Sequence, residues 1–425
     1  MIPIQHSRIR TGLESKLNIG LVSYRSNPHC GGQGVYIRHL SNALSDLGHT
    51  VEVIAGPPDP LLNHKAAVRL TMLETLDLYN PDNLFRTPRL WELKDPVNFL
   101  EWLDVSTMGY PEPFTFGMRL KRHMKQTRRA YDILHDNQSL SYGVLSLARQ
   151  MPVTATIHHP MTVDRRLAIQ STRSFLKKVK ALRWYSFIGM QKRVARRLSS
   201  IITVSESSKK DIAKEFNLPE SKFKTIPIGI DIDNFYPIDT IKKEPGRIIV
   251  TNSADTPLKG LYHLLIAVKE ISLKRPVKLV VVGTPKKGGG IEKLVKRLDL
   301  APLIRFTGRI DQGRFVREYA KAALAVVPSL YEGFGLPVGE AMACRVPVIS
   351  TTGGALSEVA GDAAKLVPPA DSNALKTAIL ELLDDPDQRD ALAEKGYQRV
   401  LNEFTWEKTA VKTVNAYKDI INDYH

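Results

Sequence analysis

The chain has 425 residues, with 60 lysines and arginines against 44 aspartates and glutamates, giving a formal net charge of +16. At about 100–200 residues per domain, this length predicts two or three domains. Hydrophobic residues make up 43% and charged residues 24%, which excludes wholesale disorder and a fibrous chain. Two cysteines, Cys30 and Cys344, allow at most one disulfide, which fits a reducing compartment better than a disulfide-stapled scaffold.

The N-terminal segment is polar and lacks the apolar core of a signal peptide. No run of about 20 apolar residues could span a bilayer, so we expect a cytoplasmic protein. The charge is unevenly distributed: residues 1–225 hold 33 basic and 19 acidic side chains, whereas residues 226–425 hold 27 and 25. Such an asymmetry is typical of two domains with different partners.

The first half opens with a strand–helix alternation. Residues 17–23 predict a buried strand, and after a glycine-rich turn the apolar residues of 35–48 recur at helical spacing. Gly48 stands where a helix would end, and 50–56 predicts the next strand. Such a β-loop-α-β unit implies a mostly parallel sheet.

The stretch 57–118 is irregular and rich in proline, and we expect it to decorate the sheet rather than join its core. A polar linker is expected at 234–246. The remaining strand candidates of the first half, including the segment that closes it, are 132–136, 153–159, 201–205 and 225–231.

The second half restarts the pattern. Continuous apolar runs such as 280–282 indicate strands buried on both faces, as in a doubly wound sheet. Strands are expected at 247–253, 278–284, 304–310, 323–329 and 347–351. Helices are expected at 260–271, 318–322, 340–344, 373–385, 387–404 and 406–425.

The predicted fold class is therefore α/β, with two Rossmann-like, doubly wound domains. We place the first at 1–232 and the second at 233–407, and expect the last helix, 408–425, to pack back onto the first domain. Ligands of such sheets bind at the carboxyl ends of the strands, near the topological switch point. Two sheets that face each other would place a cleft between them.

The most specific segment carries two glutamates separated by seven residues, Glu332 and Glu340. Between them, Gly333 and Gly335 leave a turn with exposed amide groups, and Pro337 suits the first turn of a helix. Amides at a helix N-terminus attract phosphates and hydroxyls, so the two carboxylates can grip different parts of an elongated ligand. An isolated pair of glutamates would indicate a solvated turn, but the whole combination favours a binding site.

This segment, 332–351, resembles the Glu-x7-Glu signature of the retaining glycosyltransferases of family 4, which have the GT-B fold. Residues 18–56 resemble the family's N-terminal glycine-loop unit. Further matches follow in the family's usual order at 203–212, 226–237, 280–284 and 305–310.

The resemblance implies that the first domain, 1–232, binds the acceptor and the second, 233–407, binds the nucleotide sugar, and it implies roles for single residues by position. Glu332 is expected near the donor sugar and its phosphates. Glu340 is expected to bind the ribose, because a carboxylate accepts two hydrogen bonds from a vicinal diol. Lys259 matches the lysine that holds the diphosphate, where an ammonium stabilises the developing charge. The other implied donor-binding residues of the second half are Gly333, Phe334, Gly335, Leu336 and Arg309.

Two positions depart from the family pattern. Many relatives carry an arginine six residues before the lysine, where this chain has Ser253. Ser253 can offer only a hydroxyl to the donor, so the second diphosphate cation is missing or comes from elsewhere. Many relatives also have asparagine in place of Ile228, a change expected to affect the hinge more than the chemistry.

In the first half, three glycines open a helix, Gly31, Gly32 and Gly34. Alone they indicate a tight turn, but with the resemblance the loop is expected to approach the diphosphate or the acceptor. His158 matches a histidine that faces the transferred sugar. The acceptor candidates are Asp136, Asn137 and His159.

The resemblance implies a retaining, front-face transfer of a hexose from a nucleotide-diphosphate sugar to an acceptor hydroxyl. The leaving diphosphate itself takes the acceptor proton, so no protein nucleophile, cofactor or metal is expected. UDP is favoured as the nucleotide on family frequency alone. The competing functions are a nucleotide-sugar epimerase of the same fold, which would lack the Glu-x7-Glu segment, and a non-catalytic basic adaptor, which would leave Glu332, Glu340 and Lys259 without purpose.

Residues 165–205 contain eleven basic and no acidic side chains, interleaved with aromatic and aliphatic ones. A second basic run lies at 119–129. This pattern suits an anionic bilayer surface, and predicts peripheral membrane docking with a lipid or lipid-linked acceptor. One alternative to membrane docking is that the aromatic residues form core and the charges lie on a solvated face. The alternative to a lipid acceptor is a soluble small molecule or polysaccharide. Nucleic acid is disfavoured as a partner because a cleft enzyme explains the rest of the chain.

Overall fold

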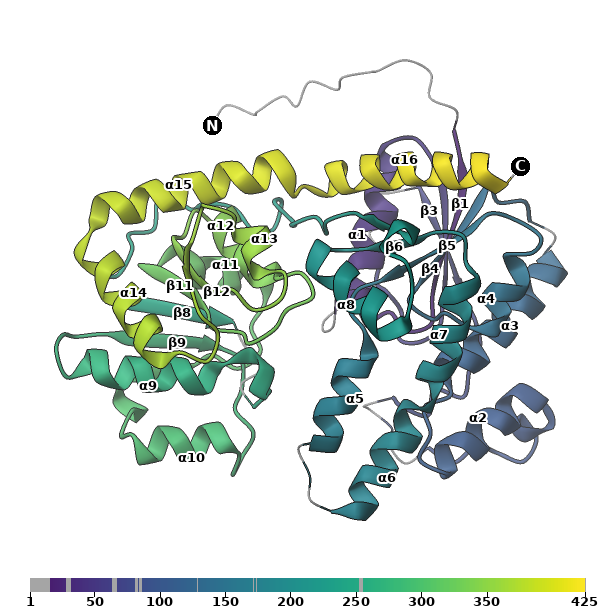
Figure 1. Cartoon of the computed structure of the whole chain (residues 1–425), viewed down its shortest axis with the longest axis horizontal. Helices are drawn as coiled ribbons and strands as arrows, with labels where there is room; N and C mark the ends of the chain where they lie inside the picture. Colours follow the sequence, from purple (N-terminus) through teal and green to yellow (C-terminus); the bar gives the residue numbers. More distant parts are fainter. Residues whose placement is uncertain are drawn as a thin grey trace.

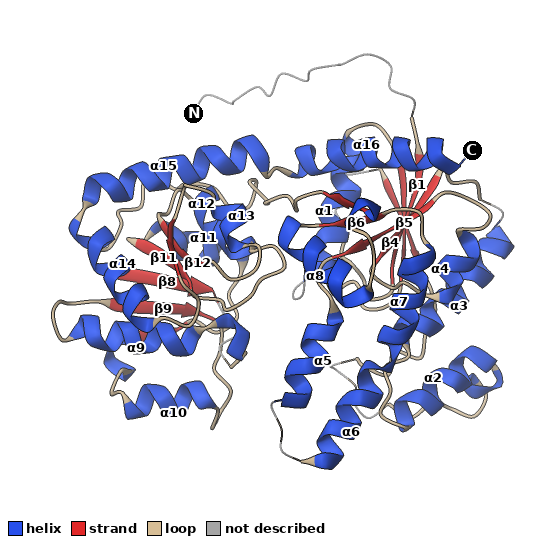
Figure 2. Cartoon of the chain, viewed as in Figure 1, coloured by secondary structure: helices blue, strands red, loops and turns tan. Residues whose placement is uncertain are grey.

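The structure is a computed structural model, which describes residues 16–424 apart from 28–31, 63–66, 81–82, 84–85, 128, 171, 173 and 252–254. In this part of the chain, two parallel sheets lie side by side, each flanked by helices (Figure 1, Figure 2). The predicted α/β class with two doubly wound sheets is confirmed.

The first sheet runs in the order β3-β2-β1-β4-β5-β6-β7 within the described residues, and its paired strands are parallel. The order reverses between β1 and β4, which places a switch point at their carboxyl ends. The strands are β1 (Asn18–Ser23), β2 (Thr50–Ala55), β3 (Val68–Met72), β4 (Ile133–Asn137), β5 (Val153–Ile157), β6 (Ile201–Thr203) and β7 (Phe223–Thr225).

The second sheet runs in the order β10-β9-β8-β11-β12-β13, again with parallel pairs in the described part of the chain. Its switch point lies between β8 and β11. The strands are β8 (Arg247–Thr251), β9 (Lys278–Val282), β10 (Ile304–Phe306), β11 (Leu324–Val327), β12 (Val348–Thr351) and β13 (Lys365–Val367).

Helices connect the strands in both halves. Those of the first half are α1 (Gly32–Asp46), α2 (Pro96–Ser106), α3 (Glu112–Thr127), α4 (Tyr142–Leu147), α5 (Met161–Gln170), α6 (Phe175–Trp184), α7 (Ile188–Arg197) and α8 (Glu206–Phe216). Those of the second half are α9 (Leu261–Ser272), α10 (Gly290–Arg297), α11 (Gln312–Ala320), α12 (Leu336–Ala343), α13 (Leu356–Ala360), α14 (Ser372–Asp384), α15 (Pro386–Glu403) and α16 (Trp406–Tyr424).

Apolar side chains cover both faces of the first sheet. On one face, Leu21 of β1 shares a hydrophobic cluster with Leu40 of α1 and Tyr417 of α16. On the other, Val22 shares a cluster with Phe116 of α3. Successive strand residues point to opposite faces, so a continuous apolar strand can exist only where helices cover both sides.

The stretch 57–118 differs from the expectation that it stays outside the sheet. It supplies β3, an edge strand paired in parallel with β2, as well as α2 and the start of α3. This edge strand is short and half-buried, and its sequence VRLTM alternates apolar and polar residues, so the period-2 signal of a strand was present in the sequence.

The chain crosses between the two halves twice, and the two crossings lie side by side. The Ile230 amide donates to the Phe404 carbonyl at 2.6 Å, and a Cβ on Gly229 would lie 2.6 Å from Trp406. After the second crossing, α16 runs along the first domain in Figure 1 and packs on α1. The Tyr417 hydroxyl lies 2.5 Å from His135 Nδ1.

Candidate functional site

A cleft of about 1710 Å³ lies between the two sheets and takes its walls from both. From the first half it is lined by Arg25, which follows β1, and from the second by Asp255, which follows β8. The crossover residue Asp231 lines its base. The cleft therefore lies at the carboxyl ends of both sheets, where doubly wound folds bind ligands.

Gly260 brings the Lys259 turn against the end of β11. Its backbone is left-handed, with φ +66°, and a Cβ there would lie 1.8 Å from the Pro328 carbonyl. The Leu330 amide donates to the Leu258 carbonyl at 2.7 Å. Because only glycine allows this approach, the Lys-Gly pair after β8 fixes where the lysine side chain emerges.

Lys259 and Glu332 form an ion pair at that point. Lys259 Nζ lies 2.7 Å from Glu332 Oε1, which also accepts from the Ser329 hydroxyl at 2.8 Å. The Glu332 backbone is tied to the neighbouring loop, since the Ala355 amide donates to its carbonyl at 2.9 Å. The structure thus brings together the lysine and the first motif glutamate, 73 residues apart in sequence.

Glu340, the second motif glutamate, lies within α12 and lines the cleft together with Leu336. Burial and the negative charge of Asp231 raise its pKa to about 7, while the nearby Lys259 opposes the shift. A group with such a pKa changes its charge in the neutral range. Pro337 lies in the first turn of α12, as expected, and Gly335 caps the helix with φ 110°.

The side chain of Phe334 does not face the cleft. It is buried in the core and packs edge-on against Phe404, so its predicted donor contact can come only from the backbone. Arg309 lines the cleft and is exposed.

Gly333 joins the two domains on the other side of the motif. Its carbonyl accepts from the hydroxyls of Ser205 at 2.7 Å and Ser208 at 2.9 Å, both at the start of α8. Glu358 of α13 accepts from the amides of Glu206 at 2.7 Å and Ser207 at 2.6 Å. A carboxylate at a helix N-terminus is favourable, because those amides have no partner within the helix.

His158 lies directly beneath this contact. A Cβ on Gly333 would lie 2.9 Å from the His158 carbonyl. The ring is buried, its Nε2 lies 2.8 Å from Asn137 Oδ1, and burial lowers its pKa to about 3. The imidazole is therefore neutral near pH 7 and donates from Nε2 to the amide oxygen, which leaves Nδ1 as an acceptor.

The three acceptor candidates lie in different surroundings. Asp136 is buried and turned into its own loop, where its carboxylate accepts from the amides of Ser139 at 3.2 Å and Leu140 at 2.6 Å. This placement favours a structural role. Asn137 bridges His158 and the start of α1, donating to the Gln33 carbonyl at 3.1 Å. His159 is half-exposed and lies 2.8 Å from Asp164.

Among the glycine-loop residues, Gly34 lies so close to Asn27 that a Cβ would be 2.0 Å from its carbonyl. Gly32 is the first residue of α1 and has open space around its Cα. Gly31, Cys30 and Ser253 lie outside the described residues.

Sequence reasoning missed cleft residues in the loop after β3, among them Asp77, Tyr79 and Asn80. They belong to the irregular, proline-rich stretch 57–118, which we expected to lie outside the core of the sheet. A usable signal was present, since Asp and Asn between prolines mark a structured turn. Lys286 and Asp311 of the second half were also missed, and both line the cleft.

Comparison with known proteins identifies the class. Residues 234–399 match the family model described as Glycosyl transferases group 1, and residues 30–234 match the one described as Glycosyltransferase Family 4. The MMP alpha-(1->4)-mannosyltransferase of Mycolicibacterium hassiacum is 40% identical over 409 residues, which cover 95% of this chain and 98% of that protein.

Solved structures show the same architecture. The sucrose-phosphate synthase of Thermosynechococcus elongatus superposes with a TM-score of 0.73 and 25% identity, over 96% of this chain and 100% of that one. Anabaena HepE in complex with UDP-glucose superposes with a TM-score of 0.66 and 16% identity, over 95% of this chain and 100% of that one. The fold is therefore that of the GT-B glycosyltransferases. The chain belongs to glycosyltransferase family 4.

Proposed function

We propose that this glycosyltransferase moves a hexose from a nucleotide-diphosphate sugar to an acceptor hydroxyl with retention of configuration. The observation that carries the proposal is that Glu340 lines the cleft and lies within electrostatic reach of Lys259, which is itself paired with Glu332. One cation and two carboxylates in this arrangement suit a ligand with a diphosphate between two hydroxyl-rich ends.

The proposed donor lies along the second domain. Glu340 would accept hydrogen bonds from the ribose hydroxyls, with Leu336 and Arg309 beside the nucleoside. Lys259 would neutralise the diphosphate, and Glu332 would hold both the lysine and the transferred sugar. The amides at the N-terminus of α12 add donors for the phosphates, since helix N-termini favour anions.

In the proposed reaction, the bond from the anomeric carbon to the diphosphate breaks and the acceptor oxygen bonds to the same face of that carbon. The acceptor proton passes to the leaving diphosphate oxygen, so no protein nucleophile is needed. Lys259 stabilises the charge that develops on the diphosphate, which leaves no required role for a metal or cofactor. His158 is neutral, and contributes a hydrogen-bond acceptor rather than a positive charge.

The relatives narrow the sugar and the nucleotide. The name of the 40% identical relative, a mannosyltransferase, supports mannose as the hexose. The HepE complexes with UDP support a nucleoside diphosphate in the cleft, and UDP remains the favoured nucleotide.

A donor panel tests the proposal. Purified protein is incubated with UDP-, GDP- and ADP-linked mannose and glucose, with and without α-(1→4)-mannotetraose as acceptor, and nucleotide release is measured. We expect nucleotide release with one of the donors. The one-bond coupling between the anomeric carbon and its proton, measured by NMR on the product, should show the same α-configuration as in the donor. Absence of turnover with every donor, with or without a crude lipid extract, overturns the proposal, and an inverted product overturns the retaining mechanism.

A specific surface supports the further proposal of peripheral docking on an anionic bilayer. The apolar side chains of α6 do not join the core: Phe175 is 76% and Leu176 is 70% exposed. Arg183 of α6 is paired with Asp104 of α2 and donates to Thr107 at 2.9 Å. Helix α2 exposes further apolar side chains, namely Phe99, Leu100 and Leu103.

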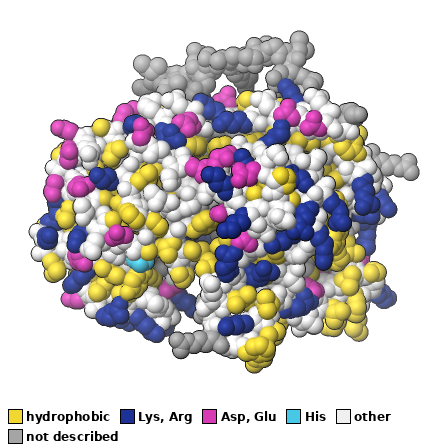
Figure 3. Space-filling view, viewed as in Figure 1, with side chains coloured by type: hydrophobic (Ala, Val, Ile, Leu, Met, Phe, Trp, Pro, Cys, Tyr) yellow, Lys and Arg dark blue, Asp and Glu magenta, His cyan; other side chains and the backbone are white. Residues whose placement is uncertain are grey.

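Figure 3 shows hydrophobic and basic side chains gathered at the end of the first domain where α6 and α2 project in Figure 1. The basic residues of α6 include Lys177, Lys178 and Lys180, and a bilayer with anionic lipids complements this charge. The alternative that the aromatic residues form core holds for Phe187, which is buried together with the aliphatic neighbours Ile188 and Met190. In the described part of the chain, no helix is both long and apolar enough to cross a membrane.

Co-sedimentation with vesicles of phosphatidylcholine and phosphatidylglycerol at low salt tests docking. Wild type is expected in the pellet with anionic vesicles and in the supernatant with phosphatidylcholine alone. The double variant Leu176→Ser and Phe175→Ser should stay in solution, whereas the matched control Leu273→Ser, at a residue that is 75% exposed in the second domain, should sediment. Wild type that remains in the supernatant overturns docking and leaves a soluble acceptor as the alternative.

A further inference from the structure

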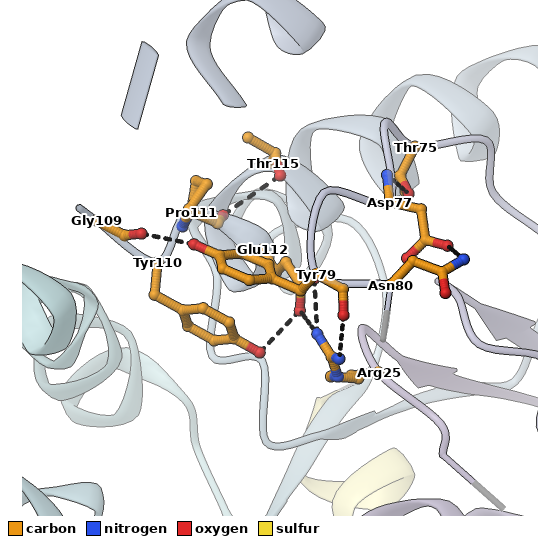
Figure 4. Close-up of polar contacts among 10 residues, drawn as sticks. All are labelled: Arg25, Thr75, Asp77, Tyr79, Asn80, Gly109, Tyr110, Pro111, Glu112 and Thr115. Atoms are coloured by element: carbon orange, nitrogen blue, oxygen red, sulfur yellow. Dashed lines mark hydrogen bonds and ion pairs between the residues drawn. The ribbon is translucent and has the colours of Figure 1, made fainter. Parts of the chain in front are cut away.

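The first-domain wall of the cleft carries a set of polar side chains on the loop that follows β3. Arg25, Asp77, Tyr79 and Asn80 all line the cleft. We call these four residues the acceptor shelf. They come from two segments more than fifty residues apart in sequence, and Figure 4 shows them in two groups of polar contacts, one that joins Arg25 to Tyr79 and Glu112 and one that joins Asp77 to Asn80.

A nearly buried carboxylate holds the shelf in place. Glu112, the first residue of α3, accepts from Arg25 Nη1 at 2.9 and 3.0 Å and from the Tyr110 hydroxyl at 2.7 Å. Arg25 Nη2 then donates to the Tyr79 carbonyl at 3.2 Å, and the Tyr79 hydroxyl donates to the Gly109 carbonyl at 2.7 Å. Arg25 and Tyr79 are therefore already fixed before a ligand binds, so they lose little conformational freedom on binding, which favours affinity.

The shelf bears no excess positive charge. The Arg25 guanidinium is compensated by Glu112. The shelf's other charged group is Asp77, whose Oδ2 accepts from Asn80 Nδ2 at 2.8 Å, and the same wall also carries Asp59 and, on α1, Arg38. Carboxylates accept hydrogen bonds from hydroxyls but repel phosphates. The opposite wall carries ionisable groups of both signs, Lys286 and Arg309 together with Asp255, Asp311 and Glu340.

Aromatic rings extend the shelf toward the surface. The ring of Tyr79 lies 5.2 Å from that of Tyr110 and 5.4 Å from that of Trp184, and the last two are stacked at 5.0 Å. Trp184 is the last residue of α6 and is 37% exposed. Aromatic surface beside a few fixed polar groups suits a ligand with an apolar face and a polar rim, as a pyranose ring has.

We propose that the acceptor shelf binds an uncharged saccharide, with its hydroxyls on Asp77 and Asn80 and a sugar ring against Tyr79. The proposal rests on the glycosyl transfer proposed above and names the acceptor class of the same cleft. The saccharide reaches the cleft past Trp184, either free or carried on a lipid at the neighbouring α6 surface. The two sources share the chemistry that the shelf recognises.

Two pairs of variants test the shelf. Asp77→Asn removes the charge but keeps the shape, and asparagine tolerates the left-handed backbone at φ 47°. Its control is Asp299→Asn, with φ 51° and an exposed side chain outside the cleft. Arg25→Lys is matched by Arg86→Lys, because each arginine is 28% exposed and paired with a glutamate.

The readout is KM for α-(1→4)-mannotetraose, with KM for the donor measured in parallel. We expect Asp77→Asn to raise the acceptor KM about tenfold, the cost of one hydrogen bond to a charged group. Arg25→Lys should raise it severalfold by removing the hydrogen bond that holds the Tyr79 carbonyl, and neither variant should raise the donor KM to the same degree. The control variants should match wild type. For wild type, the KM for mannose 6-phosphate should be higher than the KM for mannose, because the Asp77 carboxylate repels the phosphate. In Asp77→Asn the two KM values should lie closer together.

The outcomes separate this inference from the function on which it rests. If no donor is consumed under any condition, the proposed transferase reaction fails. If donor is consumed but the shelf variants leave the acceptor KM unchanged, or if mannose 6-phosphate is preferred, the shelf is overturned. Turnover of the free tetrasaccharide without vesicles supports a soluble source, and turnover only with a glycolipid in anionic vesicles supports a lipid-carried one.

Discussion

Lys259 Nζ lies 2.7 Å from Glu332 Oε1, an ion pair that links the turn after β8 to the loop after β11. The lysine is one-third exposed and the glutamate mostly buried. The positive charge of Lys259 also opposes the rise in the pKa of Glu340. One ammonium therefore connects both motif glutamates, so its removal should affect the donor site as a whole.

Substitution of Lys259 should lower the rate of transfer. We expect Lys259→Ala to reduce kcat by about 100- to 1000-fold, because a fixed donor to developing negative charge is lost. The control is Lys376→Ala, which breaks a comparable ion pair with Glu270 outside the cleft. Steady-state kinetics with saturating donor measure the effect, and a kcat within threefold of wild type would remove Lys259 from the proposed mechanism.

Nucleotide binding should depend on pH through Glu340. Its folded-state pKa of about 7 lies above the ordinary value of 4.5, so the free protein is stabilised by this group below pH 4.5 and loses that stability as pH rises through 7. Ribose hydroxyls require the ionised carboxylate, so Kd for the nucleoside diphosphate should rise about tenfold from pH 8 to pH 6. Glu340→Gln should bind more weakly and with no such dependence in calorimetry, and an equally steep slope in the variant would contradict the assignment.

The contact of Glu358 with the N-terminus of α8 should favour the closed arrangement of the domains. Its carboxylate accepts from the Glu206 and Ser207 amides across the interface, and a capping interaction of this kind is worth about 1 kcal/mol. Glu358→Ala should therefore increase the radius of gyration in small-angle scattering and weaken donor binding about fivefold. Glu381→Ala, which breaks a surface pair with Lys365, serves as control, and identical scattering curves for all three proteins would refute the role.

His158 should make the protein sensitive to acid. Burial lowers its pKa from 6.5 to about 3, so the stability it contributes is present above pH 6.5 and is lost as pH falls toward 3. In wild type, its NMR signals should not titrate between pH 5 and 8. Between the folded and unfolded pKa values, His158→Gln should reduce the pH dependence of the unfolding free energy by about one proton, and an unchanged slope would show that His158 has the same pKa in the folded and unfolded states.

The alternation of strands and helices was predictable because it depends on local patterns. Apolar runs such as 279–282 and helical spacing such as that of α1 can each be identified within a dozen residues. The Glu-x7-Glu spacing likewise predicts one carboxylate before α12 and one inside it, and both lie there. The turn at Gly260 follows the same logic, since a glycine after a lysine at a helix start indicates a special backbone conformation.

Contacts between distant segments were not predictable from these patterns. Asp136 looks like a cleft residue at the end of a central strand, yet its carboxylate satisfies amides of its own loop. The loop of Asp77 and Tyr79 looks like decoration, yet it lines the cleft. In each case the decisive partner lies on a neighbouring element or in a turn whose geometry is set by packing.

The sequence by itself determined the two parallel sheets and the order of their elements, because local periodicity carries them, and its resemblance to a known family identified the motif glutamates and the lysine. The tertiary structure decided which charged residues line the cleft, which aromatic residues of the basic stretch are exposed, and how α8 meets Gly333. Those features depend on burial and on contacts between residues a hundred or more positions apart. The +16 charge illustrates the division: its concentration in the first half is visible in the sequence, but only the fold places part of it on α6, whose last residue, Trp184, packs against Tyr79 of the shelf at which we propose the acceptor binds.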